Sequence, residues 1–475
     1  MSTTSKKELS TELFNQFPHE PTIGQTRLVE AFSRFLLSEK PRCALIIKGY
    51  AGTGKTTSVG AIVGTLRKQR RKFCLLAPTG RAAKVMSAYS GEPASTIHRR
   101  IYLPKKSKDD TTGFTLGVNK FKNTLFIVDE ASMIGSDNGL LDDLLSYVYM
   151  GTGCRLILVG DSAQLPPVGC KFSPALDEHN LRTSHALTIA TVELTEVVRQ
   201  ELNSSILFNA HQLRLSIGSS DNPNSSVVHP RFDLDVGPDL VALSGNDLQE
   251  TIETLHSKYG EDGVIVITRS NKRAVQFNQQ IRSRILWQEE DINVGDKLMV
   301  VRNNYYWLRE YDEVPIELIA NGDILEVTRI HDRFTRYGRE FAEVDVRLLD
   351  YIDSPDITVV VMLSLLNDPK GNLLLDEQKE LYRNISDDYY DLGSKSKIHS
   401  AVVMDKCYQA LQVKYAYSIT CHKAQGGQWP AIILDQGYIT EDMIDKEWLR
   451  WLYTGMTRAE SELFLLNFNT EFYTK

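Results

Sequence analysis

The chain has 475 residues, of which 42% are hydrophobic and 24% are charged, and its net charge at pH 7 is −7. This composition is typical of a soluble enzyme, and the length predicts about two to four domains. The acidic balance excludes a protein that coats nucleic acid through bulk charge, although it leaves room for a local basic groove.

The sequence holds no run of about eighteen apolar residues and no apolar signal core at its N-terminus, so we expect a cytoplasmic protein that has no contact with a membrane. The six cysteines form no C-x-x-C pair, and most of them lie in apolar runs. We interpret them as small buried hydrophobic residues rather than as zinc ligands.

A glycine-rich loop at residues 49–56 lies between an apolar run, 43–48, and a helical pattern, 57–70. Glycines let such a loop curl into a nest of N–H groups around phosphates. Lys55 would reach the β- and γ-phosphates, and the Thr56 hydroxyl would hold Mg²⁺. The alternative is an accidental glycine turn, which would not need a strand at 43–48 before it and a helix at 57–70 after it. The predicted nucleotide-binding residues here are Gly49, Ala51, Gly52, Thr53, Gly54, Lys55, Thr56 and Thr57.

Apolar, β-rich runs alternate with helical segments through the first 200 or so residues, at 44–48, 72–77, 124–128 and 154–159. This alternation predicts an α/β fold with a parallel sheet and crossover helices. Polar segments follow three of the runs, and ligands of such sheets bind beyond the carboxyl ends of the strands. We therefore expect the loops to converge on one cleft.

An acidic pair, Asp129 and Glu130, ends the apolar run 125–128. Asp129 is expected to hold the magnesium shell, and Glu130 to orient and deprotonate the attacking water. A glutamate at this position favours hydrolysis over mere nucleotide binding. The alternative is an exposed acidic pair at a strand end.

Residues 263–271 predict a buried strand of a second α/β lobe, whose sheet resumes at 415–420, 431–434 and 463–466. The intervening residues predict alternating strands at 296–301, 323–330, 340–349 and 356–363, joined by turns such as Asn321-Gly322. This pattern indicates a small β-barrel insertion. The aromatic cluster 305–307 either stacks bases or packs beneath the barrel, and the acidic, tyrosine-rich stretch 384–391 has no assigned role.

A series of segments resembles, in order, the motifs of superfamily 1B DNA helicases of the RecD-like and phage Dda-like branch. The segments are 49–56, 77–84, 94–98, 129–133, 160–168, 194–200, 415–426 and 453–459. The resemblance spans nearly the whole chain. It implies two RecA-like lobes, ATP and Mg²⁺ as cofactors, and 5′ to 3′ movement on single-stranded DNA with unwinding of forked or tailed duplexes.

The same resemblance assigns further residues to the nucleotide site. Gln164 lies where the family senses the γ-phosphate, and Arg199 and Arg458 match its two arginine fingers. Gln25 lies where the family reads adenine, although the residues before it depart from the usual leucine-led pattern. Gly426, in the segment 415–426, is also counted among the nucleotide-binding residues.

The resemblance likewise implies a DNA path. Thr79 and His98 match positions along this path on the first lobe, whereas the second lobe contributes Thr420, His422 and Lys423. The insertion 102–122 matches the place of a duplex-parting pin, and Phe114 is either its aromatic tip or an anchor of the hairpin.

The expected organisation is a first lobe at 1–200, a second lobe at 201–292 and 408–475, and an SH3-like barrel at 293–407. We expect a monomeric DNA helicase with little room for a recruiting domain. Two alternatives stay open. One is an RNA translocase, because no motif here reads the 2′-hydroxyl, and the other is a P-loop switch that binds ATP and recruits partners.

Overall fold

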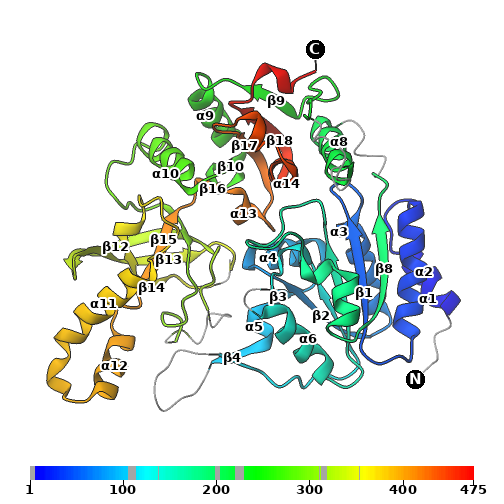
Figure 1. Cartoon of the computed structure of the whole chain (residues 1–475), viewed down its shortest axis with the longest axis horizontal. Helices are drawn as coiled ribbons and strands as arrows, with labels where there is room; N and C mark the ends of the chain where they lie inside the picture. Colours follow the sequence, from blue (N-terminus) through cyan, green and yellow to red (C-terminus); the bar gives the residue numbers. More distant parts are fainter. Residues whose placement is uncertain are drawn as a thin grey trace.

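Two parallel sheets and one closed barrel form the framework of the chain (Figure 1). The computed structural model describes residues 6–104, 114–136, 139–197, 204–219, 229–309, 311, 318–351 and 354–474. Within these ranges no helix is both long enough and apolar enough to cross a membrane. The predicted α/β class, with two RecA-like lobes and an SH3-like barrel in the second, is confirmed.

The first lobe is built on a parallel sheet with the strand order β3-β2-β6-β7-β1-β8. Helices cover both faces of this sheet. Neighbouring strand residues such as Ile46 and Ile47 point to opposite faces, and each is buried in a different apolar cluster. Strands β3 and β8 were not predicted. The strands are β1 (Cys43–Gly49), β2 (Lys72–Ala77), β3 (Ala94–Thr96), β6 (Thr124–Val128), β7 (Arg155–Gly160) and β8 (Thr188–Leu194). The helices are α1 (Lys6–Phe14), α2 (Ile23–Leu37), α3 (Lys55–Lys68), α4 (Gly80–Ser90), α5 (Ile97–Ile101), α6 (Leu140–Met150) and α7 (Glu178–Thr183).

Helix α3 shows why the sequence pattern located these elements well. Its buried residues Val59, Ile62, Val63 and Leu66 follow the spacing of one helix face. The helix begins directly after Gly54, which adopts a left-handed conformation, and ends before Arg70, which does the same. Glycine has no Cβ atom that would clash in this left-handed conformation, so the loop can turn sharply into the helix.

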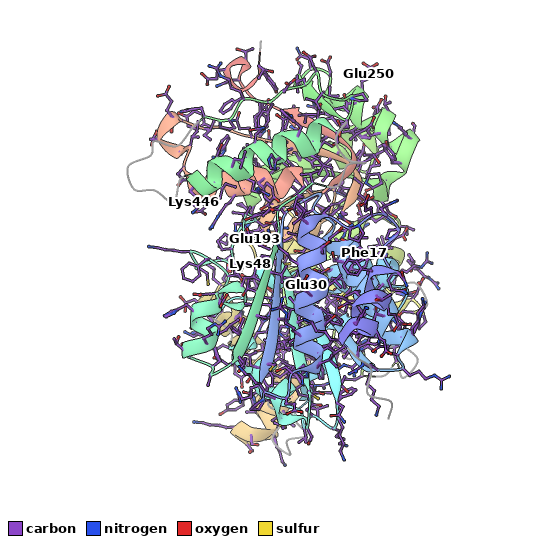
Figure 2. All side chains as sticks on the ribbon, turned by 90° about the vertical axis from the view of Figure 1, so that its right-hand side faces the viewer. Phe17, Glu30, Lys48, Glu193, Glu250 and Lys446 are labelled. Carbon is purple, nitrogen blue, oxygen red and sulfur yellow. The ribbon has the colours of Figure 1, made fainter. Side chains whose placement is uncertain are left out.

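The second lobe has a parallel sheet with the order β16-β10-β17-β18-β9. Figure 2 shows this lobe above the first, with Glu250 and Lys446 marking it, while Lys48 and Glu193 mark paired strands of the first lobe. The strands are β9 (Leu240–Leu243), β10 (Val264–Thr268), β16 (Ser418–Thr420), β17 (Trp429–Asp435) and β18 (Ala459–Leu466). The helices are α8 (Ser205–Ser219), α9 (Leu248–Tyr259), α10 (Asn271–Gln280), α13 (Cys421–Ala424) and α14 (Lys446–Met456).

The barrel differs from the predicted insertion in its last strand. Strand β15 (Leu411–Tyr415) pairs with β11 and β14, although the predicted range of the second lobe, from residue 408, includes it. The reason is that one continuous buried stretch, 411–419, is divided between two sheets at residues 416 and 417, which the composition of the stretch does not reveal. We propose that the barrel extends to residue 415. Its other strands are β11 (Lys297–Val300), β12 (Ile324–Arg336), β13 (Arg339–Leu348) and β14 (Ile357–Met362).

A pair of helices between β14 and β15 was not predicted. Helices α11 (Leu375–Asp388) and α12 (Lys395–Met404) project from the barrel at the lower left of Figure 1. The acidic, tyrosine-rich stretch forms the end of this pair. Asp388 accepts hydrogen bonds from Arg336 (2.6 Å) and from the Tyr337 hydroxyl (2.7 Å) at the β12–β13 turn. The stretch therefore anchors the helix pair to the barrel.

Candidate nucleotide site and nucleic-acid groove

The phosphate loop joins β1 to α3 with its lysine folded back onto it. Gly52 and Gly54 have φ values of 72° and 75°, which favour glycine. A Cβ atom on Gly49 would lie 2.7 Å from Lys55 Cγ, so a side chain there would displace the lysine. Lys55 Nζ donates to the Tyr50 carbonyl at 2.9 Å. The loop is thus shaped for phosphates, and Thr56, the second residue of α3, is exposed.

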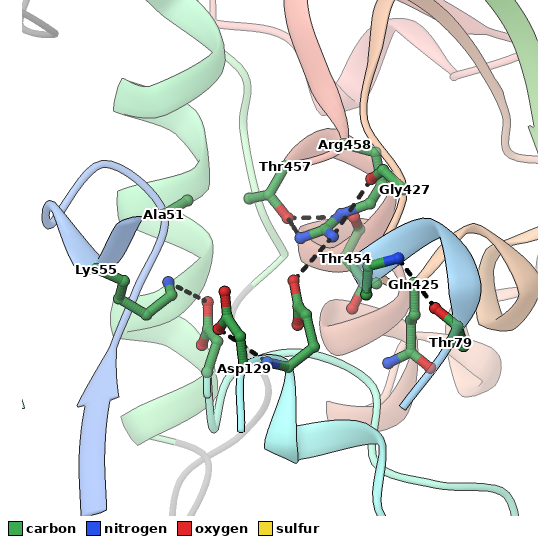
Figure 3. Close-up of polar contacts among 12 residues, drawn as sticks. Ala51, Lys55, Thr79, Asp129, Gln425, Gly427, Thr454, Thr457 and Arg458 are labelled. Atoms are coloured by element: carbon green, nitrogen blue, oxygen red, sulfur yellow. Dashed lines mark hydrogen bonds and ion pairs between the residues drawn. The ribbon is translucent and has the colours of Figure 1, made fainter. Parts of the chain in front are cut away.

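A tyrosine from the second lobe reaches this loop. Tyr453, on α14, is 1% exposed, and its hydroxyl accepts from the Ala51 N–H at 2.8 Å and donates to Asp161 Oδ2 at 2.7 Å. Lys55 Nζ lies 3.8 Å from the same Asp161 oxygen (Figure 3). Burial raises the pKa of Asp161, and the Lys55 charge opposes this rise. A chain of polar contacts therefore connects the two lobes at the phosphate loop.

Asp129 and Glu130 lie at the carboxyl end of β6, as predicted. Asp129 is partly buried, and it accepts hydrogen bonds from the Tyr89 hydroxyl (2.6 Å) and the Glu130 N–H (2.8 Å). Burial raises the pKa of Asp129, the Glu130 charge adds to the rise, and the Tyr89 hydrogen bond opposes it. Glu130 has a left-handed backbone with φ of 50°, which typically costs about 1–2 kcal/mol in a non-glycine residue. This conformation turns Glu130 away from the line of the strand.

Arg458 approaches Glu130 from the second lobe. The side chain is 5% exposed, and its Nη1 atom lies 3.5 Å from both Glu130 Oε1 and the Gly427 carbonyl (Figure 3). Its Nε atom is buried and has no hydrogen-bond partner in the described part of the chain. A buried guanidinium usually makes several short hydrogen bonds to an anion. Arg458 therefore has unused capacity for one beside Glu130.

The second lobe also contacts the loop that follows β7. The Leu165 N–H donates to Thr454 Oγ1 at 2.8 Å, and its carbonyl accepts from Gln425 Nε2 at 2.6 Å. The neighbouring Gln164 is 4% exposed, and its Oε1 atom has no partner among the described residues. Gln164 thus lies at the junction of the lobes with an unsatisfied oxygen.

Other predicted nucleotide residues have structural partners. Gln25 Oε1 accepts from the Thr22 N–H at 2.9 Å in a capping box at the start of α2, which leaves its amide NH₂ for a ligand. Gly426 (φ 73°) packs against the start of α4, where an added Cβ would lie 2.9 Å from Ala82 Cβ. Their nucleotide contacts, like that of Thr57, stay predictions. Arg199 lies outside the described residues.

A cavity of about 610 Å³ lies between the first lobe and the barrel. Most of its lining side chains are neutral. The amides can donate hydrogen bonds to the phosphate oxygens of a single strand, and the aromatic rings can stack on its bases. The predicted DNA residue His98 is part of it, and burial lowers the pKa of this histidine. The lining includes Pro78, Thr96 and His98 from the first lobe, and Arg302, Asn303, Tyr305, Asn321 and Gln412 from the barrel side.

Phe114 lies beside this cavity and contacts the barrel. It begins β5 (Phe114–Leu116), which pairs in antiparallel fashion with β4 (Tyr102–Pro104), and the turn between them lies outside the described residues. The rings of Phe114 and Tyr305 are 3.9 Å apart between centroids. The geometry therefore supports the anchor interpretation of Phe114. Trp307 instead packs beneath the barrel, where Nε1 donates to the Gln409 carbonyl at 2.8 Å.

The other predicted DNA residues do not line the cavity. Thr79 caps helix α4 by accepting from the Ala82 N–H at 3.2 Å. Thr420 precedes helix α13, which carries His422 and Lys423. Burial lowers the pKa of Lys423 to about 8 and also lowers that of His422. Contact of these four side chains with DNA stays a prediction.

Sequence reasoning missed three side chains that the structure brings to the site, namely Tyr89, Asp161 and Tyr453. Asp161 and Tyr453 lie within the motif segments 160–168 and 453–459, where the resemblance assigns roles to Gln164 and Arg458 instead. Tyr89 lies in a helix with no such signal. Its contact with Asp129 becomes visible only in three dimensions.

Two protein families match parts of the chain. The AAA domain family matches residues 24–220, and the UvrD-like helicase C-terminal domain family matches residues 415–466. The ATP-dependent RecD2 DNA helicase of Deinococcus radiodurans is 34% identical over 36% of this chain, which spans 21% of that protein. The ATP-dependent DNA helicase Dda of Enterobacteria phage T4 is 26% identical over 88% of this chain and 93% of its own length.

The chain is similar to helicases of the RecD-like and Dda-like branch. A crystal structure of the Pif1 helicase from Bacteroides with ADP-AlF3 and single-stranded DNA is also similar, with a TM-score of 0.48 at 15% identity, covering 96% of this chain and 95% of that one. The two family matches and the RecD2 and Dda relatives confirm the resemblance predicted from the motifs.

The Tyr453 hydroxyl is expected to stabilise the contact between the lobes. Tyr453→Phe removes one hydrogen-bond partner from each of two groups, the Ala51 N–H and buried Asp161. We expect the free energy of unfolding to fall by about 1–3 kcal/mol, as measured by urea denaturation. Tyr149→Phe is the matched control, because it loses one bond to the Cys43 carbonyl within the first lobe. A smaller loss in Tyr453→Phe than in the control would contradict the assignment.

Proposed function

We propose that this chain is an ATP-dependent DNA helicase that moves along single-stranded DNA, in the 5′ to 3′ direction. The observation that carries the proposal is the buried, incompletely paired Arg458 of one lobe beside Glu130 of the other, close to a phosphate loop. The names of the RecD2 and Dda relatives support the choice of DNA helicase, and the chain spans most of Dda.

The residues present fit ATP with Mg²⁺. Magnesium prefers oxygen ligands, a few from protein and the rest from phosphates and water. The hydroxyl of the exposed residue Thr56 and the Asp129 carboxylate would supply the protein's share. Among the described residues no cluster of three or more His, Cys, Asp or Glu side chains forms a metal site. When bound, Mg²⁺ would neutralise charge on the β- and γ-phosphates.

Hydrolysis would then use groups from both lobes. Lys55 would leave Asp161 for the β- and γ-phosphates, and Glu130 would take a proton from the attacking water. Arg458 would turn its free donors to the γ-phosphate and stabilise the charge that develops in the transition state. Arg199 is proposed as the second such arginine.

Movement would follow from changes in the contacts between the lobes. Tyr453, Thr454 and Gln425 connect α13 and α14 to the phosphate loop and the loop that follows β7. If bound ATP and bound ADP contact these groups differently, hydrolysis would shift the lobes relative to each other, because a ligand favours the conformation that it binds more tightly. The cavity between the first lobe and the barrel is where we place the strand.

The test of the proposal is ATP hydrolysis measured alone, with single-stranded DNA, and with RNA of the same length and sequence. We expect strong stimulation by DNA and little by RNA. Duplexes with a 5′ or a 3′ single-stranded tail then report direction, and we expect unwinding of the 5′-tailed duplex. Stimulation by RNA alone would establish the RNA translocase instead, and no stimulation by either polymer would favour a nucleotide switch.

Phe114 should matter for unwinding more than for hydrolysis. Its contact with Tyr305 holds the β4–β5 hairpin against the barrel, and an aromatic pair of this kind stabilises by about 0.5–1.5 kcal/mol beyond burial. We expect Phe114→Ala to lower the unwinding rate about threefold to tenfold while DNA-stimulated hydrolysis changes less than twofold. Phe114→Tyr keeps an aromatic ring and serves as the control. Equal losses of unwinding and hydrolysis in Phe114→Ala would contradict the anchoring role.

A further inference from the structure

Helix α4 connects the barrel and the second lobe to the candidate metal ligand. Its first half packs on both: Arg81 lies over the Trp429 ring, 3.9 Å from the centroid, and Lys84 Nζ donates to the Leu349 carbonyl at 2.9 Å. Near its last turn, the Tyr89 hydroxyl donates to Asp129 at 2.6 Å. One helix of the first lobe therefore contacts the barrel, the second lobe and the acidic pair.

The first turn of α4 is confined by its neighbours. A Cβ atom on Gly80 would lie 2.8 Å from Asp323 Oδ1 of the barrel. A Cβ atom on Gly426 of the second lobe would likewise lie 2.9 Å from Ala82 Cβ and 3.2 Å from Thr79 Oγ1. A displacement of the barrel or of the second lobe must therefore either move α4 or break these contacts, since packed interiors do not compress.

The contact at the other end fixes a carboxylate. Asp129 Oδ1 accepts from the Glu130 N–H and Oδ2 accepts from Tyr89, so the plane of the carboxylate is set by two donors. Each oxygen has two lone pairs, so one on each remains for a metal or its water. Hydrogen bonds of this kind orient metal-binding carboxylates, and their loss typically lowers metal affinity or activity by 10- to 100-fold.

We propose that Tyr89 is a positioning residue that holds Asp129 in the orientation Mg²⁺ requires, and that α4 makes this orientation depend on the barrel and the second lobe. The proposal rests on the proposed function and deepens it. It supplies a physical route by which a strand bound between the first lobe and the barrel would accelerate hydrolysis at Asp129 and Glu130.

The first experiment needs no hydrolysis. Binding of a fluorescent ADP analogue is titrated with Mg²⁺ for wild type, Tyr89→Phe and the control Tyr149→Phe, whose hydroxyl bonds the Cys43 carbonyl away from the site. We expect the Mg²⁺ concentration for half-maximal binding to rise about tenfold in Tyr89→Phe only. Affinity measured in EDTA should be unchanged. A Mg²⁺ midpoint equal to that of wild type would overturn the positioning role, whatever the change in melting temperature.

The second experiment tests the link through α4. At saturating Mg²⁺ we expect Tyr89→Phe to lower the DNA-stimulated kcat about tenfold with little change in the KM for ATP. Lys84→Ala removes the hydrogen bond from α4 to the Leu349 carbonyl and the ion pair with Asp350. It should keep the wild-type Mg²⁺ midpoint and basal rate but lose about threefold in DNA stimulation. Full stimulation in Lys84→Ala would overturn the link. If wild type itself shows no DNA stimulation, the proposed function fails, while the Mg²⁺ titration still decides the role of Tyr89.

Discussion

Lys55→Ala is expected to lower DNA-stimulated ATP hydrolysis by at least about a hundredfold. Lys55 is the first residue of α3, and its amine lies 2.9 Å from the Tyr50 carbonyl and 3.8 Å from Asp161, within the loop where phosphates would bind. Alanine retains the helix but removes the positive charge that would stabilise the γ-phosphate in the transition state. The measurement is steady-state hydrolysis with saturating single-stranded DNA.

The matched control is Lys68→Ala, which removes an exposed lysine from the other end of the same helix. It should leave hydrolysis within about twofold of wild type, because exposed charges far from the site contribute little. Binding of single-stranded DNA by Lys55→Ala should also persist, since the cavity with Thr96 and His98 does not include the phosphate loop. Near-normal hydrolysis in Lys55→Ala would remove the basis for an ATP-driven motor.

Features that depend on neighbouring residues were accessible from the sequence. The phosphate loop could be predicted because glycine spacing, the preceding strand and the following helix are all local. The acidic pair followed from its position after a buried strand, and β6 ends at Val128 as that reasoning required. The parallel sheets followed from the alternation of strands and helices.

Features that depend on distant residues were not accessible. No pattern around Tyr453 indicates that its hydroxyl meets Ala51, about 400 residues earlier, and none around Tyr89 indicates Asp129. The division of residues 411–419 between the barrel and the second sheet depends on which edge is free to pair, which is a tertiary property. The side chains that connect the lobes could therefore be identified only from the structure.

Arg458→Ala is expected to separate ATP binding from hydrolysis. An arginine that stabilises the transition state of phosphoryl transfer contributes about 10³–10⁵ to kcat. Arg458 is nearly fully buried, its Nε has no partner in the described part of the chain, and its closest carboxylate, Glu130, is 3.5 Å away. We therefore expect kcat to fall about a thousandfold, with ATP affinity changed less than tenfold, when both are measured with single-stranded DNA present.

Arg458→Lys provides the sharper comparison, because it keeps the charge but loses the planar fork of donors. If the fork acts on the γ-phosphate, lysine should restore little of the rate, whereas a role limited to pairing with Glu130 should be largely restored. Melting temperatures distinguish these outcomes from simple loss of structure. A kcat within tenfold of wild type in Arg458→Ala would contradict a role of Arg458 in stabilising the transition state.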